Sequence, residues 1–73
     1  MVEFPYTLEQ VKAATANILG TEIYQAIIGS FFLYKAVQIA GEQAFMYNDE
    51  GPDVEILRKT LRHVKSGGYL PNA

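Results

Sequence analysis

The sequence predicts an all-α domain of three helices, short, long and short, which associates with a second copy through the long middle helix. The 73 residues are 49% hydrophobic and 19% charged, the composition of a folded domain. Turn-forming residues divide the chain into three segments, and the middle one is apolar around its whole circumference. A chain of this length forms a single domain, 1–73, in which residues 66–73 are expected to be a flexible tail.

The first helix is expected at residues 8–19 because a capping box precedes it. The Thr7 hydroxyl can accept a hydrogen bond from the backbone N–H of Gln10, and the Gln10 side chain can accept one from the N–H of Thr7. Apolar side chains then recur along one helical face, and Gly20 suits the left-handed conformation in which helices often end.

The middle helix is expected to cover residues 22–47, since no proline interrupts this segment and the turn sequence YNDEGPD follows it. At 1.5 Å per residue such a helix is roughly 38 Å long, about twice the length of its neighbours. The two shorter helices could cover only part of its apolar surface. We therefore expect other surface, from lipid or from a second chain, to cover the rest.

The composition of the stretch AIIGSFFLYKAVQIAG, residues 26–41, indicates whether lipid or protein covers the apolar surface of this helix. A membrane span needs about 20 predominantly apolar residues, whereas Lys35 and Gln38 interrupt this stretch. Burial against protein is therefore the preferred interpretation. The alternative is a small membrane-associated subunit, or a virion or filament subunit, with helix 22–47 as its span or seam; Lys35 could then extend toward the membrane surface.

Small side chains on the middle helix predict where two copies meet. They share one face of roughly 100°, which lets two helix backbones approach closely. A short chain gains from such a contact, because alone it buries only about 60% of its unfolded surface. An ordinary contact with the first or third helix of the same chain is the other interpretation. The predicted interface of the homodimer or higher oligomer comprises Ala26, Ile27, Ser30, Leu33, Val37, Ala40, Gly41 and Ala44.

The third helix, expected at residues 53–65 and ending before the SGG sequence at 66–68, concentrates positive charge. Residues 1–57 have a net charge of −6, whereas residues 58–73 have +4. Complementation of the helix dipole is the first interpretation, pairing with an acidic surface the second and weak nucleic-acid binding the third. The net charge of −2 and the pI near 5.2 argue against nucleic acid. The basic face comprises Arg58, Lys59, Arg62 and Lys65.

No set of residues in the sequence indicates a catalytic, cofactor or metal site. The chain has no cysteine for a zinc site, and its one histidine, His63, is expected at a surface or interface. The segment NDEGPDVE lacks the alternating oxygen ligands of a calcium loop. The N-terminus lacks a signal-peptide pattern, so a cytoplasmic location is expected. We expect a non-enzymatic structural or regulatory protein–protein interaction module whose partner is itself, with another protein as a further option.

Overall fold

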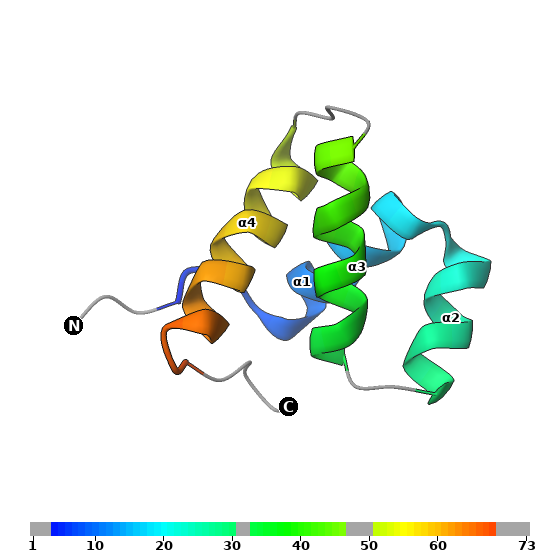
Figure 1. The fold of residues 1–73 in the computed structure, drawn as a ribbon, viewed down its shortest axis with the longest axis horizontal. Helices are drawn as coiled ribbons and strands as arrows, with labels where there is room; N and C mark the ends of the chain where they lie inside the picture. Colours follow the sequence, from blue (N-terminus) through cyan, green and yellow to red (C-terminus); the bar gives the residue numbers. More distant parts are fainter. Residues whose placement is uncertain (1–3, 31–32, 47–50, 69–73) are drawn as a thin grey trace.

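The computed structural model describes residues 4–30, 33–46 and 51–68, and within these ranges the protein has four helices and no strand (Figure 1). The predicted all-α class is therefore confirmed. The first and last predicted helices also agree with the structure to within one residue. The four helices are α1 (Leu8–Leu19), α2 (Thr21–Ser30), α3 (Leu33–Met46) and α4 (Pro52–Lys65).

The middle segment corrects the expectation of one helix over 22–47. Helix α2 ends at Ser30 and α3 begins at Leu33, while residues 31, 32 and 47 lie outside the described ranges. Gly29 lowers helix stability by about 1 kcal/mol relative to alanine, and serine competes for backbone hydrogen bonds. Division into two helices lets α2 lie beside α3, so each covers part of the other (Figure 1).

The core lies where α1, α3 and α4 pack against one another. In the described part of the chain, α2 contacts α1 and α3 but not α4, so it flanks this three-helix unit (Figure 1). The radius of gyration is 11.4 Å, close to the roughly 11 Å expected for a folded chain of this length. One copy thus reaches the dimensions of a folded domain. The buried core cluster comprises Val11, Ala14, Leu19, Tyr24, Ala36, Val37, Ala40 and Leu57.

The ends of α1 follow the sequence signals. The backbone N–H of Gln10 donates to the Thr7 hydroxyl at 3.2 Å, and the N–H of Thr7 donates to the Gln10 side chain at 2.8 Å, which completes the predicted capping box. Gly20 ends the helix with φ of 88° and donates its N–H to the carbonyl of Ala16. The positive φ explains why a glycine stands between α1 and α2.

The start of α4 uses backbone geometry in place of a side-chain cap. Gly51, with φ of 142°, precedes the helix, and Pro52 occupies its first turn. Asp53 lies in the first turn of α4, and its carboxylate accepts a hydrogen bond from the Asn17 side chain at 3.2 Å, which links α4 to α1. Ser66 follows the last turn of α4, and residues 69–73 of the predicted tail lie outside the described ranges.

Candidate functional site

The described residues contain no group of three or more histidine, cysteine, aspartate or glutamate side chains that could hold a metal ion. His63 is half-buried, and its ring stacks on Phe4 with 4.4 Å between ring centroids and 10° between planes. This aromatic contact ties the residues before α1 to α4. The structure therefore places His63 in a packing contact.

A membrane span receives no support from the described helices, none of which has both the length and the apolar character needed to cross a bilayer. The longest of them have 14 residues, against the roughly 20 that a span requires.

The predicted oligomer interface is distributed over two helices with different surroundings. Four of its five α3 members form the inner face of that helix: Val37 and Ala40 are 0% exposed, Ala44 is 1% exposed and Gly41 is buried. This face packs inside the chain, so it is not available to a second copy in this conformation. Self-association itself stays a prediction.

The remaining members of the predicted interface lie nearer the surface. Ala26 on α2 is exposed, Ile27 is half-buried, and Leu33 at the start of α3 is half-buried. The side chain of Ser30 is outside the described set. Ile23, which the sequence interpretation left out, is 52% exposed and lies one helical turn from Ala26 and Ile27.

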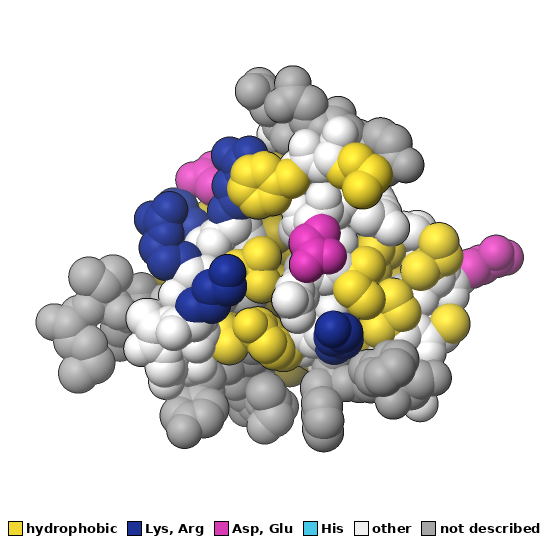
Figure 2. Space-filling view, in the orientation of Figure 1, with side chains coloured by type: hydrophobic (Ala, Val, Ile, Leu, Met, Phe, Trp, Pro, Cys, Tyr) yellow, Lys and Arg dark blue, Asp and Glu magenta, His cyan; other side chains and the backbone are white. Residues whose placement is uncertain are grey.

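We define the α2 surface as Ile23, Ala26 and Ile27, which lie at i, i+3 and i+4 on one side of the helix. Helix α2 is strongly apolar, yet of its described side chains only Tyr24 is buried. Figure 2 shows a hydrophobic surface over α2 and the adjoining side of α3. This surface is a candidate for contact with another chain.

The four residues of the predicted basic face are exposed on α4, and their neighbours divide them into two groups. Lys59 forms an ion pair with Glu55 at 3.1 Å, one turn earlier on α4, and its ammonium lies 5.8 Å from the centre of the Tyr6 ring. The hydrogen bond from the ammonium to the Glu55 carboxylate raises the pKa of Lys59. Lys59 is therefore compensated within the chain.

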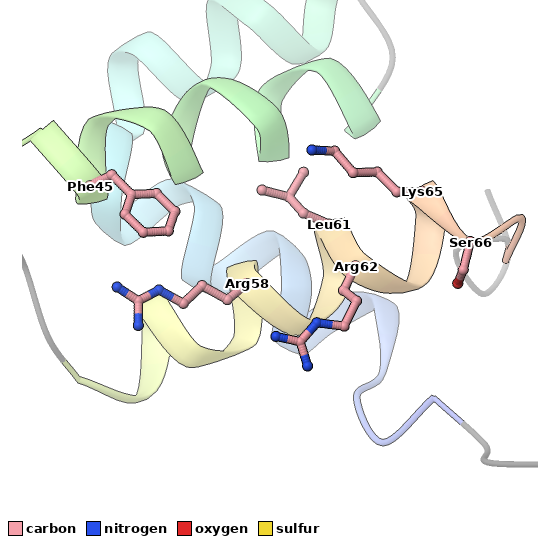
Figure 3. A pocket seen from close by; sticks show the side chains of 6 residues that line it. All are labelled: Phe45, Arg58, Leu61, Arg62, Lys65 and Ser66. Atoms are coloured by element: carbon pink, nitrogen blue, oxygen red, sulfur yellow. The ribbon is translucent and has the colours of Figure 1, made fainter.

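The other three cations, Arg58, Arg62 and Lys65, line a groove between α3 and α4 (Figure 3). The Lys59–Glu55 pair is the only salt bridge in the described part of the chain, so these three side chains have no carboxylate partner there. The groove has a volume of about 550 Å³. We call it the α3–α4 groove; its lining residues are Phe45, Arg58, Leu61, Arg62, Lys65 and Ser66.

The apolar part of the α3–α4 groove consists of Phe45 from α3 and Leu61 from α4. Phe45 is 61% exposed, and the guanidinium carbon of Arg58 lies 4.6 Å from the centre of its ring, a cation–π contact. Leu61 approaches the backbone of Gly41 so closely that a Cβ added there would lie 2.7 Å from a Leu61 methyl carbon. Gly41 thus sets the close packing of α3 and α4 beneath the groove.

A second hollow lies between α1 and α2, with a volume of about 420 Å³. Its lining includes Glu9, Lys12 and the buried side chain of Tyr24. Burial, with a smaller contribution from the negative charge of Glu9, raises the pKa of the Tyr24 hydroxyl. Tyr24 is therefore neutral at physiological pH and serves packing between the two helices.

Three residues of the α3–α4 groove, Phe45, Leu61 and Ser66, were absent from the predicted sites. Leu61 had a usable signal, because Arg58, Leu61, Arg62 and Lys65 are spaced i, i+3, i+4 and i+7 on one side of α4. Phe45 had none, since only the packing of α3 on α4 brings its ring to Arg58. No family model, curated protein or solved structure matches this chain.

Proposed function

We propose that the protein is a non-enzymatic protein–protein interaction module that associates with a second copy of itself through the α2 surface. The observation that supports this proposal is the position of an apolar helix at the edge of the fold. Ile23 is 52% exposed and Ala26 is exposed, although burial of an isoleucine side chain contributes about 1.5 to 3 kcal/mol. A second copy would remove these side chains from water.

Twofold packing of α2 on α2 is the simplest closed arrangement, because one patch then meets an identical patch. Ala26 is small enough to let the two helices approach closely, while Ile23 and Ile27 flank it. The contact is expected to be weak. A ten-residue helix is about 15 Å long, and a stable interface needs about 800 Å² per partner, roughly a sixth of the 5111 Å² surface of this chain.

A concentration series of the detergent-free protein on a light-scattering sizing column tests this proposal. We expect the mass to rise from 8.1 kDa toward a dimer as concentration increases. A dissociation constant of about 10 μM to 1 mM is expected for a contact of this size. Added salt should change the mass little, because the α2 surface contains no charged side chain.

Two charge insertions and one control locate the contact. Ile23→Glu and Ala26→Glu should each keep the chain at 8.1 kDa throughout the series. Met46→Glu is the matched control, because Met46 is 75% exposed on α3 and lies outside the α2 surface; it should behave as the unmodified chain. A constant mass of 8.1 kDa for the unmodified chain, or equal loss of dimer in all three variants, would refute the proposal.

A further inference from the structure

We propose that the α3–α4 groove is a docking site for an acidic, amphipathic helical segment of another protein. Phe45 and Leu61 form its apolar part, and Arg58, Arg62 and Lys65 surround it with positive charge (Figure 3). Figure 2 shows lysine and arginine side chains gathered over α4 next to the hydrophobic surface between α4 and α3. A ligand that matches this groove needs both an apolar side chain and carboxylates.

The cations are available to such a ligand. Arg58, Arg62 and Lys65 are all exposed, and none has a carboxylate partner in the described part of the chain. Arg58 is also held in place by its contact with the Phe45 ring at 4.6 Å. An ordered guanidinium loses less freedom on binding a carboxylate than a mobile one does. The opposite case, Lys59, is already paired with Glu55.

The spacing of the cations indicates a helical ligand. Arg58, Arg62 and Lys65 are spaced i, i+4 and i+7 on α4, so they extend over about 10 Å, or two turns. A second helix lying along the groove repeats its own side chains with the same spacing, and can present carboxylates to all three cations. Insertion of an amphipathic helix into an apolar groove is an established mode of peptide recognition.

A polyanion fits the groove less well than an acidic peptide. A polyanion binds mainly through contacts between its phosphates and positive charges. It would leave the apolar side chains of Phe45 and Leu61 in this groove without a partner. The Arg58 guanidinium already covers one face of the Phe45 ring, so a base could not stack on that face. These observations favour a protein segment as the occupant.

The docking site is independent of the self-association proposed for α2. Helix α2 makes no contact with α4 in the described part of the chain, and α3 separates the two (Figure 1). The monomeric variant Ile23→Glu should therefore bind the acidic segment as well as the unmodified chain does. If the unmodified chain stays at 8.1 kDa but binds the acidic segment, only the self-association has failed. If the chain dimerises but does not bind the segment, only the docking site has failed.

The test is fluorescence anisotropy with a labelled, alanine-rich peptide of about 18 residues, long enough to be partly helical. It has glutamates at i, i+4 and i+7 beside leucines on the same face, and a control peptide replaces each glutamate by glutamine. At about 0.1 M salt we expect saturable binding of the first peptide and at least about tenfold weaker binding of the second. Equal binding of the two peptides, or no binding of either, would overturn the proposal.

Two double variants with the same change in net charge separate the groove from long-range attraction. Arg58→Glu with Arg62→Glu should weaken binding at least about tenfold, whereas Lys12→Glu with Lys35→Glu should weaken it less than about threefold. Phe45→Ala should weaken binding about threefold to tenfold while leaving the fold intact, since Phe45 is 61% exposed. Circular dichroism on every variant confirms folding.

Three results would contradict the docking site. If both double variants weakened peptide binding equally, the binding would come from long-range electrostatic attraction and not from a specific site. Tighter binding of a thymidine oligonucleotide than of the acidic peptide, lost in the Arg58 and Arg62 double variant, would assign the groove to nucleic acid. If vesicles of phosphatidylserine and phosphatidylcholine bound more tightly than the acidic peptide, and the Arg58 and Arg62 double variant lost this binding, the groove would be assigned to a membrane surface.

Discussion

Replacement of Ala40 by leucine tests whether the small side chains of α3 pack inside the chain or between two chains. Ala40 is 0% exposed and belongs to the same core cluster as Val11, Val37 and Leu57. Leucine adds three carbon atoms at a position with no free surface. Insertion of extra carbons into a packed core costs about 1 to 3 kcal/mol, because neighbouring side chains leave their preferred rotamers.

This cost is large relative to the stability of so short a chain. At roughly 0.05 to 0.15 kcal/mol per residue, 73 residues give a free energy of unfolding of about 4 to 11 kcal/mol. Each kcal/mol lowers the melting temperature of a domain of this size by about 4 to 8 °C. The Ala40→Leu variant should therefore melt about 5 to 20 °C below the unmodified chain.

Thermal unfolding followed by far-ultraviolet circular dichroism, at a concentration where the protein is monomeric, measures this difference. Ala13→Leu is the matched control, because Ala13 is exposed on α1 and the same substitution there should change stability by less than about 0.5 kcal/mol. The packing of α3 inside the chain would be refuted if Ala40→Leu melted within about 2 °C of the unmodified chain while abolishing a dimer seen by light scattering.

Four further predictions concern the two ends of α1, a glycine inside α2 and the buried Tyr24. Thr7→Ala removes the capping-box bond to Gln10 and should cost about 1 kcal/mol in urea unfolding. Gly20→Ala should destabilise by about 1 to 3 kcal/mol because of its φ of 88°, whereas Gly29→Ala, inside α2 with open space around it, should stabilise by up to about 1 kcal/mol in the same assay. Because the pKa of Tyr24 is raised in the folded chain, the unfolded chain loses this proton at lower pH, so stability should fall as pH rises above about 10. Melting temperatures measured from neutral pH to pH values above the ordinary pKa of 10.0 should show this fall, and Tyr24→Phe should lessen it.

Local signals in the sequence were sufficient for the ends of α1 and α4. The capping box at Thr7 and the glycine at Gly20 act within a few residues, so their effect does not depend on the rest of the fold. The charge concentration on α4 is likewise visible in the sequence, because i, i+4 spacing places Arg58 and Arg62 on one face of any helix that forms there.

The division between α2 and α3 could not be derived in the same way. A glycine at position 29 lowers helix stability by only about 1 kcal/mol, which tertiary packing can easily outweigh in either direction. The gain that decides the outcome comes from packing of α2 against α1 and α3. Since the sequence interpretation assumed one long helix, it assigned the buried α3 residues Val37 and Ala40 to an intermolecular contact.

The α3–α4 groove could not be predicted in full either, because the packing of the helices was not known from the sequence. Its cations were predicted, but its apolar part requires α3 and α4 to be neighbours, with Gly41 allowing Leu61 to approach the α3 backbone. Phe45 lies two residues before the turn sequence YNDEGPD, and nothing in its local pattern distinguishes a groove residue from a core residue. Sites built from two helices are therefore visible only once the packing is known.

If two copies associate through α2, the dimer contains two α3–α4 grooves, because α2 and α4 flank α3 on different sides (Figure 1). A partner with two acidic helices on one linker would then bind both grooves, and the second contact would form at an effective concentration of about 1 mM, independent of the bulk concentration.

This avidity separates the dimer from the docking site in one experiment. A tandem acidic peptide should bind the unmodified protein at least about tenfold more tightly than the single peptide does. Ile23→Glu, which keeps the groove but loses the α2 surface, should bind the tandem and single peptides with affinities within about twofold of each other, as statistics for two identical sites require. An unchanged advantage of the tandem peptide in Ile23→Glu would mean that the two grooves are brought together by a contact other than α2.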